Sequence, residues 1–469
     1  MDFLIQNVRV WLDATYQFVD VQISQDCISA ISPAYSQPTE NRIVVNGQDK
    51  LLLPGFVNAH THSSQIWQRG LIPQLPLELW LADVFDSSPT HLEQFYLAAL
   101  RTAVDTLLSG GTCLMDHAYL LPNQELETVA ALVKGYREVG IRALIAPLIQ
   151  DQPFVAGLPG GNALPQSAYP RSTAEILAMM EQIIQQFHRP ETGISIAVGP
   201  TGFHRCSDQL LEGCIELSQR YGLCRHIHLL ETRAQKLLAQ ERYSGSAVTH
   251  LKQIGFLNNR TSLAHAVWLD DAEIQLLAET KATVVHNPVS NLRLGSGIAP
   301  VLKYRAAGIN LAFGCDGAAS NDAQDLLEAI KLGTILHAVT DPDYQHWLTP
   351  YEAIEMAALG GARGVGLADL VGSLSVGKTA DLVLYDLTHP SLQPCTDPIQ
   401  LLVLGRPSQV VERVWINGKL IVIDGKVATI DAQQLNQNLL HWQQKAPLPQ
   451  FQTIKQVELH YRKLLPRFD

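Results

Sequence analysis

The feature that most constrains the fold is a series of short apolar runs between residues 51 and 320. Each run is followed by a polar cluster and then by a helical pattern, such as Leu92–Ser109 or Thr173–Phe187. Continuous apolar strands that alternate with amphipathic helices are typical of a parallel sheet covered by helices. Eight such units predict an α/β chain with a (β/α)8 TIM barrel. The eight runs are residues 52–60, 111–116, 142–148, 194–200, 224–230, 261–267, 283–288 and 310–316.

Two long insertions interrupt this pattern, at residues 61–91 after the first run and at residues 150–172 after the third. The second insertion is rich in Gly, Pro and Ala. Long loops of this kind either close over an active site or simply cover the surface. Both interpretations of residues 150–172, a moving lid and an ordinary loop, stay open.

The two ends of the chain show a different pattern. Residues 3–32 alternate apolar and polar side chains, and the same pattern returns after residue 370 around a hairpin turn at 417–419. Such alternation is typical of antiparallel strands. We therefore predict that residues 1–53 and 371–430 together form one small β-sandwich domain. Residues 54–370 then form the barrel, and residues 431–469 a C-terminal helical tail.

Composition excludes several classes of function. The net charge is −11, which disfavours a nucleic-acid backbone as partner and fits a small neutral or cationic molecule. The seven cysteines form no Cys-x-x-Cys pair, so neither a disulfide framework nor a thiolate zinc site is predicted. The first residues lack the pattern of a secretory signal, and no apolar run has the length of a membrane span. We expect a cytoplasmic protein without membrane contact.

Titratable side chains gather at the predicted strand ends. His60 and His62 end the first run, and alternate residues of a strand point to the same face. His228, His265 and Asp316 end later runs. Active sites of (β/α)8 barrels lie where the strands end at their C-terminal side. The pattern therefore predicts a metal site at this rim. His117 and Asp116 end the second run, and we interpret them as structural.

The same stretches carry a family resemblance that covers nearly the whole chain. The motifs that carry it are Pro54–His62, His228-x-x-Glu231, Leu263-Ala264-His265, residues 286–301 and residues 314–322. They resemble the amidohydrolase superfamily, in particular the group that holds methylthioadenosine/S-adenosylhomocysteine deaminases and the triazine (ATZ/TRZ) hydrolases. The resemblance implies His60, His62, His228 and Asp316 as metal ligands, Glu231 as proton shuttle and His265 beside the metal-bound water.

Chemistry independently favours these residue types. Three imidazoles and a carboxylate can hold a divalent ion that keeps a water molecule and lowers its pKa towards ~7. Glu231 is a suitable general acid/base, Asp316 can also accept the hydroxide proton, and His265 can stabilise the developing oxyanion. Residues 194–200 contain no Lys, whereas binuclear members of the superfamily use a carboxylated Lys there, so one ion is favoured. Zinc is the expected metal, with Fe²⁺ and Mn²⁺ as alternatives.

We therefore predict a hydrolase acting on carbon–nitrogen bonds other than peptide bonds. It would replace the exocyclic amino group of an aromatic nitrogen heterocycle (a purine, pterin or triazine-like ring) by metal-activated hydroxide and release ammonia. Three alternatives stay open: a methylthioadenosine/S-adenosylhomocysteine-type nucleoside deaminase, a triazine hydrolase that displaces halide or alkylamine, and a non-catalytic metal- or ligand-binding barrel. The expected assembly is a homo-oligomer, a dimer or a tetramer.

The substrate contacts are predicted with less support. The nucleoside deaminases of this group carry an Arg, a Glu and a His at positions that fall here at Pro147, near Pro89 and at Thr201, which favours a free heterocycle over a nucleoside. Gln65 is placed to hydrogen-bond a heterocycle and a tryptophan of the same loop to stack on it. The candidate substrate-binding residues are Gln65, Trp67, Trp80, Thr201, His286 and Asn291.

One further motif points to a different function. Residues 372–379 match the phosphate-binding P-loop pattern letter for letter. A P-loop needs a strand before it and a helix after it, so that the helix N-terminus meets the phosphate. Here a helical pattern precedes the motif and a strand pattern follows it, so we interpret it as a turn that leads back into the β-sandwich.

Overall fold

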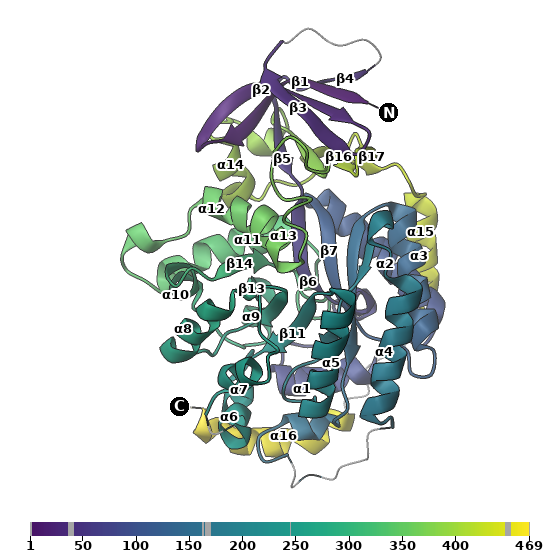
Figure 1. Cartoon of the computed structure of the whole chain (residues 1–469), viewed down its shortest axis with the longest axis vertical. Helices are drawn as coiled ribbons and strands as arrows, with labels where there is room; N and C mark the ends of the chain where they lie inside the picture. Colours follow the sequence, from purple (N-terminus) through teal and green to yellow (C-terminus); the bar gives the residue numbers. More distant parts are fainter. Residues whose placement is uncertain are drawn as a thin grey trace.

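The computed structural model describes residues 2–35, 42–161, 164, 170–243, 245–445 and 452–468. Strands from both chain ends lie at one end of the molecule, and helices surround parallel strands in the rest (Figure 1). The expected α/β character is confirmed by this arrangement. Among the described residues, no helix combines the length and the apolar character that crossing a membrane requires.

The two chain ends build one nine-stranded sheet in the order β18-β17-β16-β15-β5-β1-β2-β3, with β4 paired to β1. The halves join where β5 pairs antiparallel with β15, with Leu52 opposite Leu384. Trp415 and Phe3 pack edge to face in the core of this sheet. That the sheet forms a separate β-sandwich domain stays a prediction. Its strands are β1 (Phe3–Leu12), β2 (Thr15–Ser24), β3 (Cys27–Pro33), β4 (Ile43–Asn46), β5 (Lys50–Pro54), β15 (Leu382–Asp386), β16 (Val411–Ile416), β17 (Lys419–Ile423) and β18 (Lys426–Val427).

The eight apolar runs all contain strands, and these strands are parallel and buried. The first group is β6 (Phe56–Thr61), β7 (Gly111–Ala118), β8 (Arg142–Ile149), β9 (Ile194–Ile196) and β10 (Gly199–Pro200), and the second is β11 (Arg225–Leu229), β12 (Thr261–His265), β13 (Thr283–His286) and β14 (Asn310–Phe313). A single β-bridge between Gly202 and His228 connects the end of the first group to the start of the second. The end of the second group contacts the start of the first, where the Asp316 amide donates to the His60 carbonyl at 3.0 Å. Closure into a complete barrel stays a prediction.

Helices follow the strands as the periodicity predicts, and side-chain caps mark several of their starts. Ser172 forms a capping box with Glu175 at the start of α4, and Ser207 caps α5. These caps satisfy amide groups that the first helical turn leaves without intrahelical partners. The helices are α2 (Leu92–Leu108), α3 (Glu125–Val139), α4 (Thr173–Phe187), α5 (Asp208–Tyr221), α6 (Arg233–Arg242), α7 (Ala247–Gln253), α8 (Asp271–Thr280), α9 (Pro288–Arg293), α10 (Val301–Ala306) and α11 (Leu326–Ile335).

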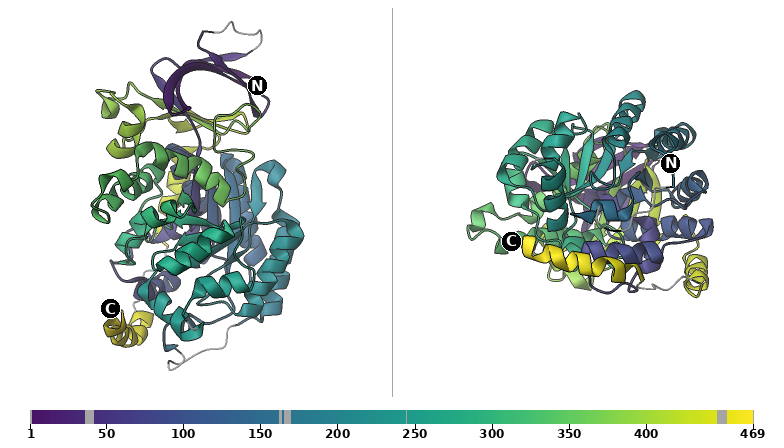
Figure 2. Two further views of the ribbon diagram at one scale, coloured as in Figure 1. Left: turned by 60° about the vertical axis from the view of Figure 1, so that its left-hand side comes forward. Right: turned by 90° about the horizontal axis from the view of Figure 1, so that it is seen from below.

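The insertion after β6 folds into a 3-10 helix, η1 (Ser63–Gln68), and the helix α1 (Leu77–Asp86). The insertion after β8 contains η2 (Phe154–Gly157), but residues 162–163 and 165–169 lie outside the described residues, so the lid interpretation stays untested. Beyond β18 follow α15 (Ala432–Gln443), α16 (Gln452–Leu464) and η10 (Leu465–Arg467). Figure 2 shows α16, in yellow, at the end of the molecule opposite the nine-stranded sheet.

The segment between β14 and β16 holds the P-loop-like motif. Residues 372–379 follow the helix α13 (Gly361–Gly364) and precede the strand β15, which is the reverse of the order that phosphate binding needs. The Lys378 ammonium donates to the carbonyl groups of Ala368 and Val371 at 2.7 and 3.2 Å, so it ties the motif to the turn that follows α13. The segment between β14 and β16 also contains the short helices α12 (Pro350–Glu355), the π-helical η7 (Met356–Gly360), η8 (Pro390–Leu392), α14 (Pro398–Gln400) and the π-helical η9 (Leu401–Gly405).

Candidate metal centre and pocket

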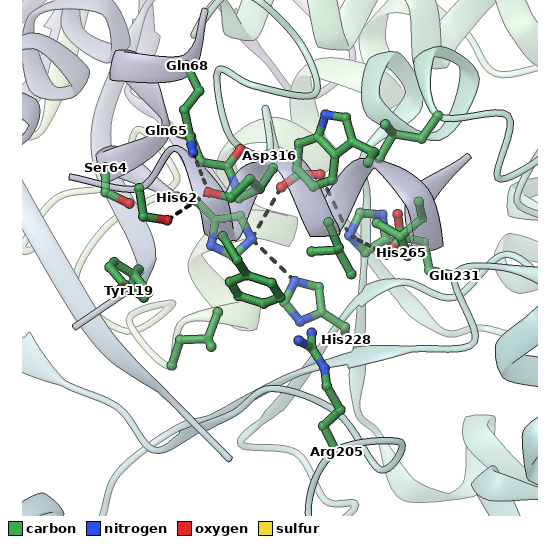
Figure 3. Close-up of a pocket in the computed structure, with 18 of the residues that line it drawn as sticks. His62, Ser64, Gln65, Gln68, Tyr119, Arg205, His228, Glu231, His265 and Asp316 are labelled. Atoms are coloured by element: carbon green, nitrogen blue, oxygen red, sulfur yellow. Dashed lines mark hydrogen bonds and ion pairs between the residues drawn. The ribbon is translucent and has the colours of Figure 1, made fainter. Parts of the chain in front are cut away.

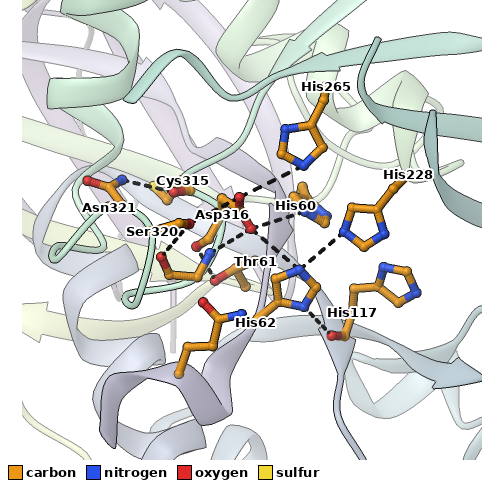
Figure 4. A network of polar contacts seen from close by, with 12 residues as sticks. His60, Thr61, His62, His117, His228, His265, Cys315, Asp316, Ser320 and Asn321 are labelled. Atoms are coloured by element: carbon orange, nitrogen blue, oxygen red, sulfur yellow. Dashed lines mark hydrogen bonds and ion pairs between the residues drawn. The ribbon is translucent and has the colours of Figure 1, made fainter. Parts of the chain in front are cut away.

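Four of the predicted side chains meet at the ends of β6, β11 and β14 (Figure 4). Nε2 of His60 and Nε2 of His62 lie 3.3 and 3.4 Å from Oδ1 of Asp316. Nε2 of His62 lies 3.3 Å from Nε2 of His228. Three imidazole nitrogens and one carboxylate oxygen therefore converge from three different strands.

Hydrogen bonds fix the rotation of two of these rings. Nδ1 of His62 donates to the main-chain carbonyl of His117 at 2.6 Å, and Nδ1 of His228 donates to that of Thr201 at 2.7 Å. Because a neutral imidazole carries one N–H, the lone pair of each ring is then on Nε2, which faces the cluster. Burial lowers the pKa of His60 to about 4 and that of His228 well below its usual range, so both rings are neutral at pH 7.

Asp316 presents an ionised carboxylate to the neutral rings. Its Oδ1 accepts from the Gly317 amide at 2.8 Å, and its Oδ2 accepts from the Ser320 hydroxyl at 3.2 Å. Burial raises the pKa of Asp316, but the imidazole groups of His60, His265 and His62 around it hold it well below its usual range. Its backbone is left-handed, with φ 57°, a strained conformation that turns the side chain toward the cluster.

The donor set fits a divalent metal ion. Nε2 of His60 is fully buried and has no hydrogen-bond partner among the described residues, although a buried polar atom normally has one. Imidazole nitrogen and carboxylate oxygen are the ligands that zinc prefers outside thiolate sites. The described residues contain two overlapping groups of potential ligands: His60, His62, His117 and His228, and His60, His265 and Asp316. His117 thus lies beside the site, with Nε2 donating to the Gly199 carbonyl at 2.9 Å.

Glu231 and His265 lie on the open side of this cluster. Nε2 of His265 is 3.7 Å from Oε2 of Glu231 and 3.8 Å from Oδ2 of Asp316, so it faces both carboxyl groups. Burial, with the charges of Asp316 and Glu78, raises the pKa of Glu231 well above its usual range. His265 has a left-handed backbone with φ 71°. A protonatable carboxyl and an imidazole beside a metal site can accept, hold and deliver protons.

A pocket opens above the cluster (Figure 3). One wall is apolar and comes from α1, through Leu77, Trp80, Leu81, Val84 and Phe85. The floor is formed by His62, His228, His265, Asp316 and Glu231, and further polar groups come from Gln65, Gln68, His204, Arg205 and Gln235. An apolar slot with a few convergent polar groups is the usual form of a site for a flat organic molecule.

The structure separates the predicted substrate-binding residues into two sets. Gln65 and Trp80 line the pocket, whereas the other four are not among its lining residues. Trp67 donates to the Gln94 carbonyl at 3.0 Å, and His286 faces His337 in the interior, with 3.4 Å between their Nε2 atoms. Thr201 uses its carbonyl to orient His228, and Oδ1 of Asn291 accepts from Nδ1 of His265 at 2.8 Å.

His204 and Arg205 are pocket residues that the sequence analysis missed. Both are nearly buried, with 6% and 5% of their surface exposed, and both lie in the loop that follows β10. Figure 3 shows the Arg205 guanidinium directed toward His228. Their position directly after the fourth run could have indicated that they line the site, since the loops that follow barrel strands carry functional residues. The pocket therefore contains a histidine three residues after Thr201, although position 201 is not a histidine.

Asn291 provides a test of how His265 is positioned. Removing its side chain by Asn291→Ala takes away the hydrogen bond at Nδ1 of His265. A buried hydrogen bond contributes about 1 kcal/mol, and about 1.4 kcal/mol corresponds to a tenfold change in rate, so we expect kcat to fall about fivefold. The matched control is Ser290→Ala, a neighbouring buried side chain whose hydroxyl has no partner among the described residues. Equal kcat values for both variants would contradict this role.

The C-terminal helix α16 holds the apolar wall of the pocket in place. Its Val457 packs with Leu79 of α1 and with Leu158, and Nε2 of His460 donates to the Pro159 carbonyl at 2.7 Å. Figure 1 shows α16 below α1. The side chains of α1 that face the pocket lie on the other side of the same helix, so α16 sets their position indirectly.

A charge in that contact tests the role of α16. Val457 is 3% exposed, so Val457→Asp places a carboxylate in an apolar cluster and loosens α16 from α1. We expect KM to rise several-fold while kcat changes less, because an apolar wall without titratable groups contributes to binding and not to proton transfer. The control is Leu459→Asp on the same helix, where Leu459 is 71% exposed. Unchanged KM in both folded variants would show that α16 does not position the wall.

Comparison with known proteins places the chain in a family. Residues 51–421 match the amidohydrolase family. The 5-methylthioadenosine/S-adenosylhomocysteine deaminase of Caldanaerobacter subterraneus subsp. tengcongensis is 32% identical over 441 residues, covering 93% of this chain and 96% of that protein. The 5'-deoxyadenosine deaminase of Methanopyrus kandleri is 31% identical over 396 residues, covering 84% and 86%. The protein belongs to the amidohydrolase family and is a hydrolase, and the resemblance read from its motifs is confirmed.

Solved structures agree with this placement. An adenosine deaminase from Xanthomonas campestris with bound zinc superposes with a TM-score of 0.85 at 28% identity, covering 95% of this chain and 98% of that one. An atrazine chlorohydrolase from Arthrobacter aurescens complexed with zinc has a TM-score of 0.86 at 24% identity, covering 94% and 100%. The second likeness shows the fold alone. The predicted amidohydrolase type of fold is confirmed.

Proposed function

We propose that this amidohydrolase is a metal-dependent deaminase of aromatic nitrogen heterocycles. It replaces an exocyclic amino group of a purine, pterin or triazine-like ring with oxygen and releases ammonia. The observation that carries the proposal is the convergence of His60, His62, His228 and Asp316 beside Glu231 and His265 in one pocket. Relatives over most of the chain are named deaminases, which supports the same reaction class.

His60, His62, His228 and Asp316 would hold one divalent ion, with zinc as the proposed metal. The zinc in the deaminase from Xanthomonas campestris and the absence of Lys from residues 194–200 support this choice. When bound, such an ion supplies a Lewis acid that lowers the pKa of a water molecule towards ~7. That the protein forms a homo-oligomer and works in the cytoplasm stays a prediction from the sequence.

In this proposal Glu231 accepts and delivers the protons that the reaction moves. As a carboxylate it accepts a proton from the attacking water while the carbon–oxygen bond forms, and it delivers that proton to the ring nitrogen. Glu231 then takes the remaining proton of that water from the new hydroxyl group and delivers it to the amino group, so that the carbonyl forms as the carbon–nitrogen bond breaks and ammonia leaves. The raised pKa of Glu231 makes its carboxylate a stronger proton acceptor than an exposed glutamate, which suits the first transfer from water. His265, with Nε2 facing Glu231 and Asp316, stabilises the charge that develops on oxygen.

The ring is held in the slot above these groups. Trp80 of α1 presents its indole to the pocket and donates its N–H to the Ala319 carbonyl at 3.2 Å, which fixes the ring plane. Gln65 lines the same pocket beside the Ala319 amide. Aromatic stacking and an amide that both donates and accepts are suited to a flat heterocycle.

A nucleoside is the second candidate substrate. The named nucleoside deaminases that cover most of the chain favour it. A second cavity shares Phe85, Tyr119 and Leu148 with the pocket and offers space for a substituent on the ring. Pro147 and Pro89, at positions where the nucleoside deaminases carry charged groups, favour the free heterocycle. Displacement of halide or alkylamine by the same attack is the remaining alternative.

A substrate panel tests the proposal. We would measure kcat/KM for amino-purines, pterins and aminotriazines, for adenosine and 5'-deoxyadenosine, and for S-adenosylhomocysteine, with chloride and alkylamine release followed in parallel for substituted triazines. We expect the free heterocycles to be turned over far better than S-adenosylhomocysteine. Comparable values would show that the argument from Pro147 and Pro89 is wrong and that the nucleoside is the substrate. Chloride or alkylamine release without deamination of any ring would replace the deaminase proposal.

A further inference from the structure

His226 and His228 form a second His-x-His pair, on β11. The proposed chemistry uses His228 but not His226. It precedes His228 by two residues on β11 and is fully buried. Nδ1 of His60 lies 2.7 Å from Nε2 of His226, and Nδ1 of His226 lies 2.6 Å from Oγ of Ser262. Ser262 is also fully buried and is the register partner of His226 on the neighbouring strand β12. The three side chains form a continuous chain of hydrogen bonds.

The direction of these hydrogen bonds follows from the chemistry of imidazole. To bind a metal ion through Nε2, neutral His60 must carry its proton on Nδ1, which then donates to His226. His226 must therefore accept at Nε2 and carry its own proton on Nδ1, which donates to the Ser262 hydroxyl oxygen. If His226 held its proton on Nε2, it would donate to His60, force the proton of His60 onto Nε2, and remove the lone pair that a metal ion needs.

His60 differs in this respect from the other two imidazoles. Nδ1 of His62 and Nδ1 of His228 donate to main-chain carbonyls, which can only accept, so their protonated nitrogen is fixed by the backbone. The partner of His60 is an imidazole, which can either donate or accept. In its accepting form His226 carries its proton on Nδ1, and the Ser262 hydroxyl, whose oxygen can accept that proton, lies within hydrogen-bond distance of this nitrogen.

We propose that His226 and Ser262 are positioning residues that hold His60 in its metal-binding form. The Ser262 hydroxyl oxygen accepts from Nδ1 of His226 and stabilises that form of the ring, and Nε2 of His226 then accepts from Nδ1 of His60. The inference rests on the proposed metal centre, and it adds that the affinity of the centre for its ion is set from β12, through a side chain that never touches the ion. Hydrogen-bond partners of this kind typically change metal affinity 10–100-fold, an order-of-magnitude range.

The test is the affinity of the purified, metal-depleted full chain for Zn²⁺, measured by competition with a chromophoric chelator. We expect Ser262→Ala to bind Zn²⁺ about 10–100-fold more weakly than the wild type and Ser262→Thr, which keeps the hydroxyl, to bind close to it. His226→Leu should be weaker by a similar factor, and His226→Gln, whose amide oxygen can accept from His60, should recover part of the loss. The control is Thr261→Ser on the same strand, whose hydroxyl donates to the Phe256 carbonyl at 2.8 Å, outside the chain.

A double variant separates positioning from a merely structural effect. If Ser262 acts through His226, the variant with both Ser262→Ala and His226→Leu should bind Zn²⁺ no more weakly than His226→Leu alone, because the losses are shared. Losses that add, or a Ser262→Ala protein with wild-type affinity, would overturn the inference. A wild-type protein that binds no Zn²⁺ would instead refute the proposed metal centre, so the two failures are distinguishable. Melting temperatures of the metal-free variants show whether each one is folded.

Discussion

Glu231→Gln is expected to lower kcat by about 10²–10⁴ or more while the protein stays folded and keeps its metal. Glutamine keeps the shape of the side chain and a hydrogen bond but cannot carry a proton. The proposed reaction uses Glu231 more than once in each turnover, so both the attack and the departure of ammonia would slow. The carboxyl group of Glu231 lies beside His265 and accepts a hydrogen bond from the Ser296 hydroxyl at 3.4 Å. The amide oxygen of a glutamine can accept the same hydrogen bond. The measurement is kcat with the best substrate, alongside zinc content by elemental analysis.

Two outcomes would contradict this role. A Glu231→Gln enzyme with near-normal kcat would show that another group moves the proton, and a variant that purifies without metal would make Glu231 a ligand. The matched control is Gln235→Ala, which removes a neighbour that lines the same pocket and accepts from the Glu231 amide at 2.9 Å, but which has no proton to transfer. We expect this control to alter KM more than kcat.

His60→Ala or Asp316→Ala is expected to reduce the metal content from about one ion per chain to nearly none. Each variant removes one of the converging ligand atoms, so the remaining ligands would hold the ion too weakly to retain it during purification. Activity should fall to background with the metal. Because binding to the folded chain stabilises it, wild-type protein should also melt at a higher temperature with zinc than without, and the two variants should lose most of that difference.

The control for the metal prediction is His337→Ala, a buried histidine that faces His286 away from the cluster. Its metal content should match that of the wild type. Two ions per chain in the wild type, or unchanged metal content in both His60→Ala and Asp316→Ala, would refute the ligand set.

The strands and the residues at their ends could be predicted from the sequence because both follow from local pattern. A buried parallel strand requires a continuous apolar run, and the side chain that follows it must lie at the C-terminal edge of the sheet, as His60, His228 and Asp316 do. These positions depend on a few neighbouring residues and on one general rule of the architecture. The positions of His60, His62, His228, Asp316, Glu231 and His265 in one cluster could therefore be expected without coordinates.

Contacts that depend on the rotation of a side chain could not be predicted in this way. Asn291 and Thr201 were expected to contact substrate, but Asn291 holds His265 and Thr201 offers its carbonyl to His228. Trp67 and Trp80 lie in the same insertion, yet only Trp80 lines the pocket, because the helix α1 turns it inward while Trp67 packs against α2. Spacing along a loop of this length does not determine such directions.

Contacts between distant parts of the chain could not be predicted from the sequence either. The contact of α16 with α1 joins residues more than 350 positions apart, and no local pattern indicates which surface a C-terminal helix covers. The link between His60 and His226 likewise crosses the interior from β6 to β11. His226 stands two residues before His228 in the sequence, but only the positions of Nδ1 and Nε2 show what its side chain can do.

The most direct test of the account is ammonia release by the purified protein from a panel of amino-substituted heterocycles, measured in three states: with its metal, after removal of the metal by a chelator, and after zinc is restored. The account predicts release from at least one ring, loss of that activity with the metal, and recovery with zinc. No release from any ring by metal-loaded protein, or release that persists unchanged after the metal is removed, would contradict it.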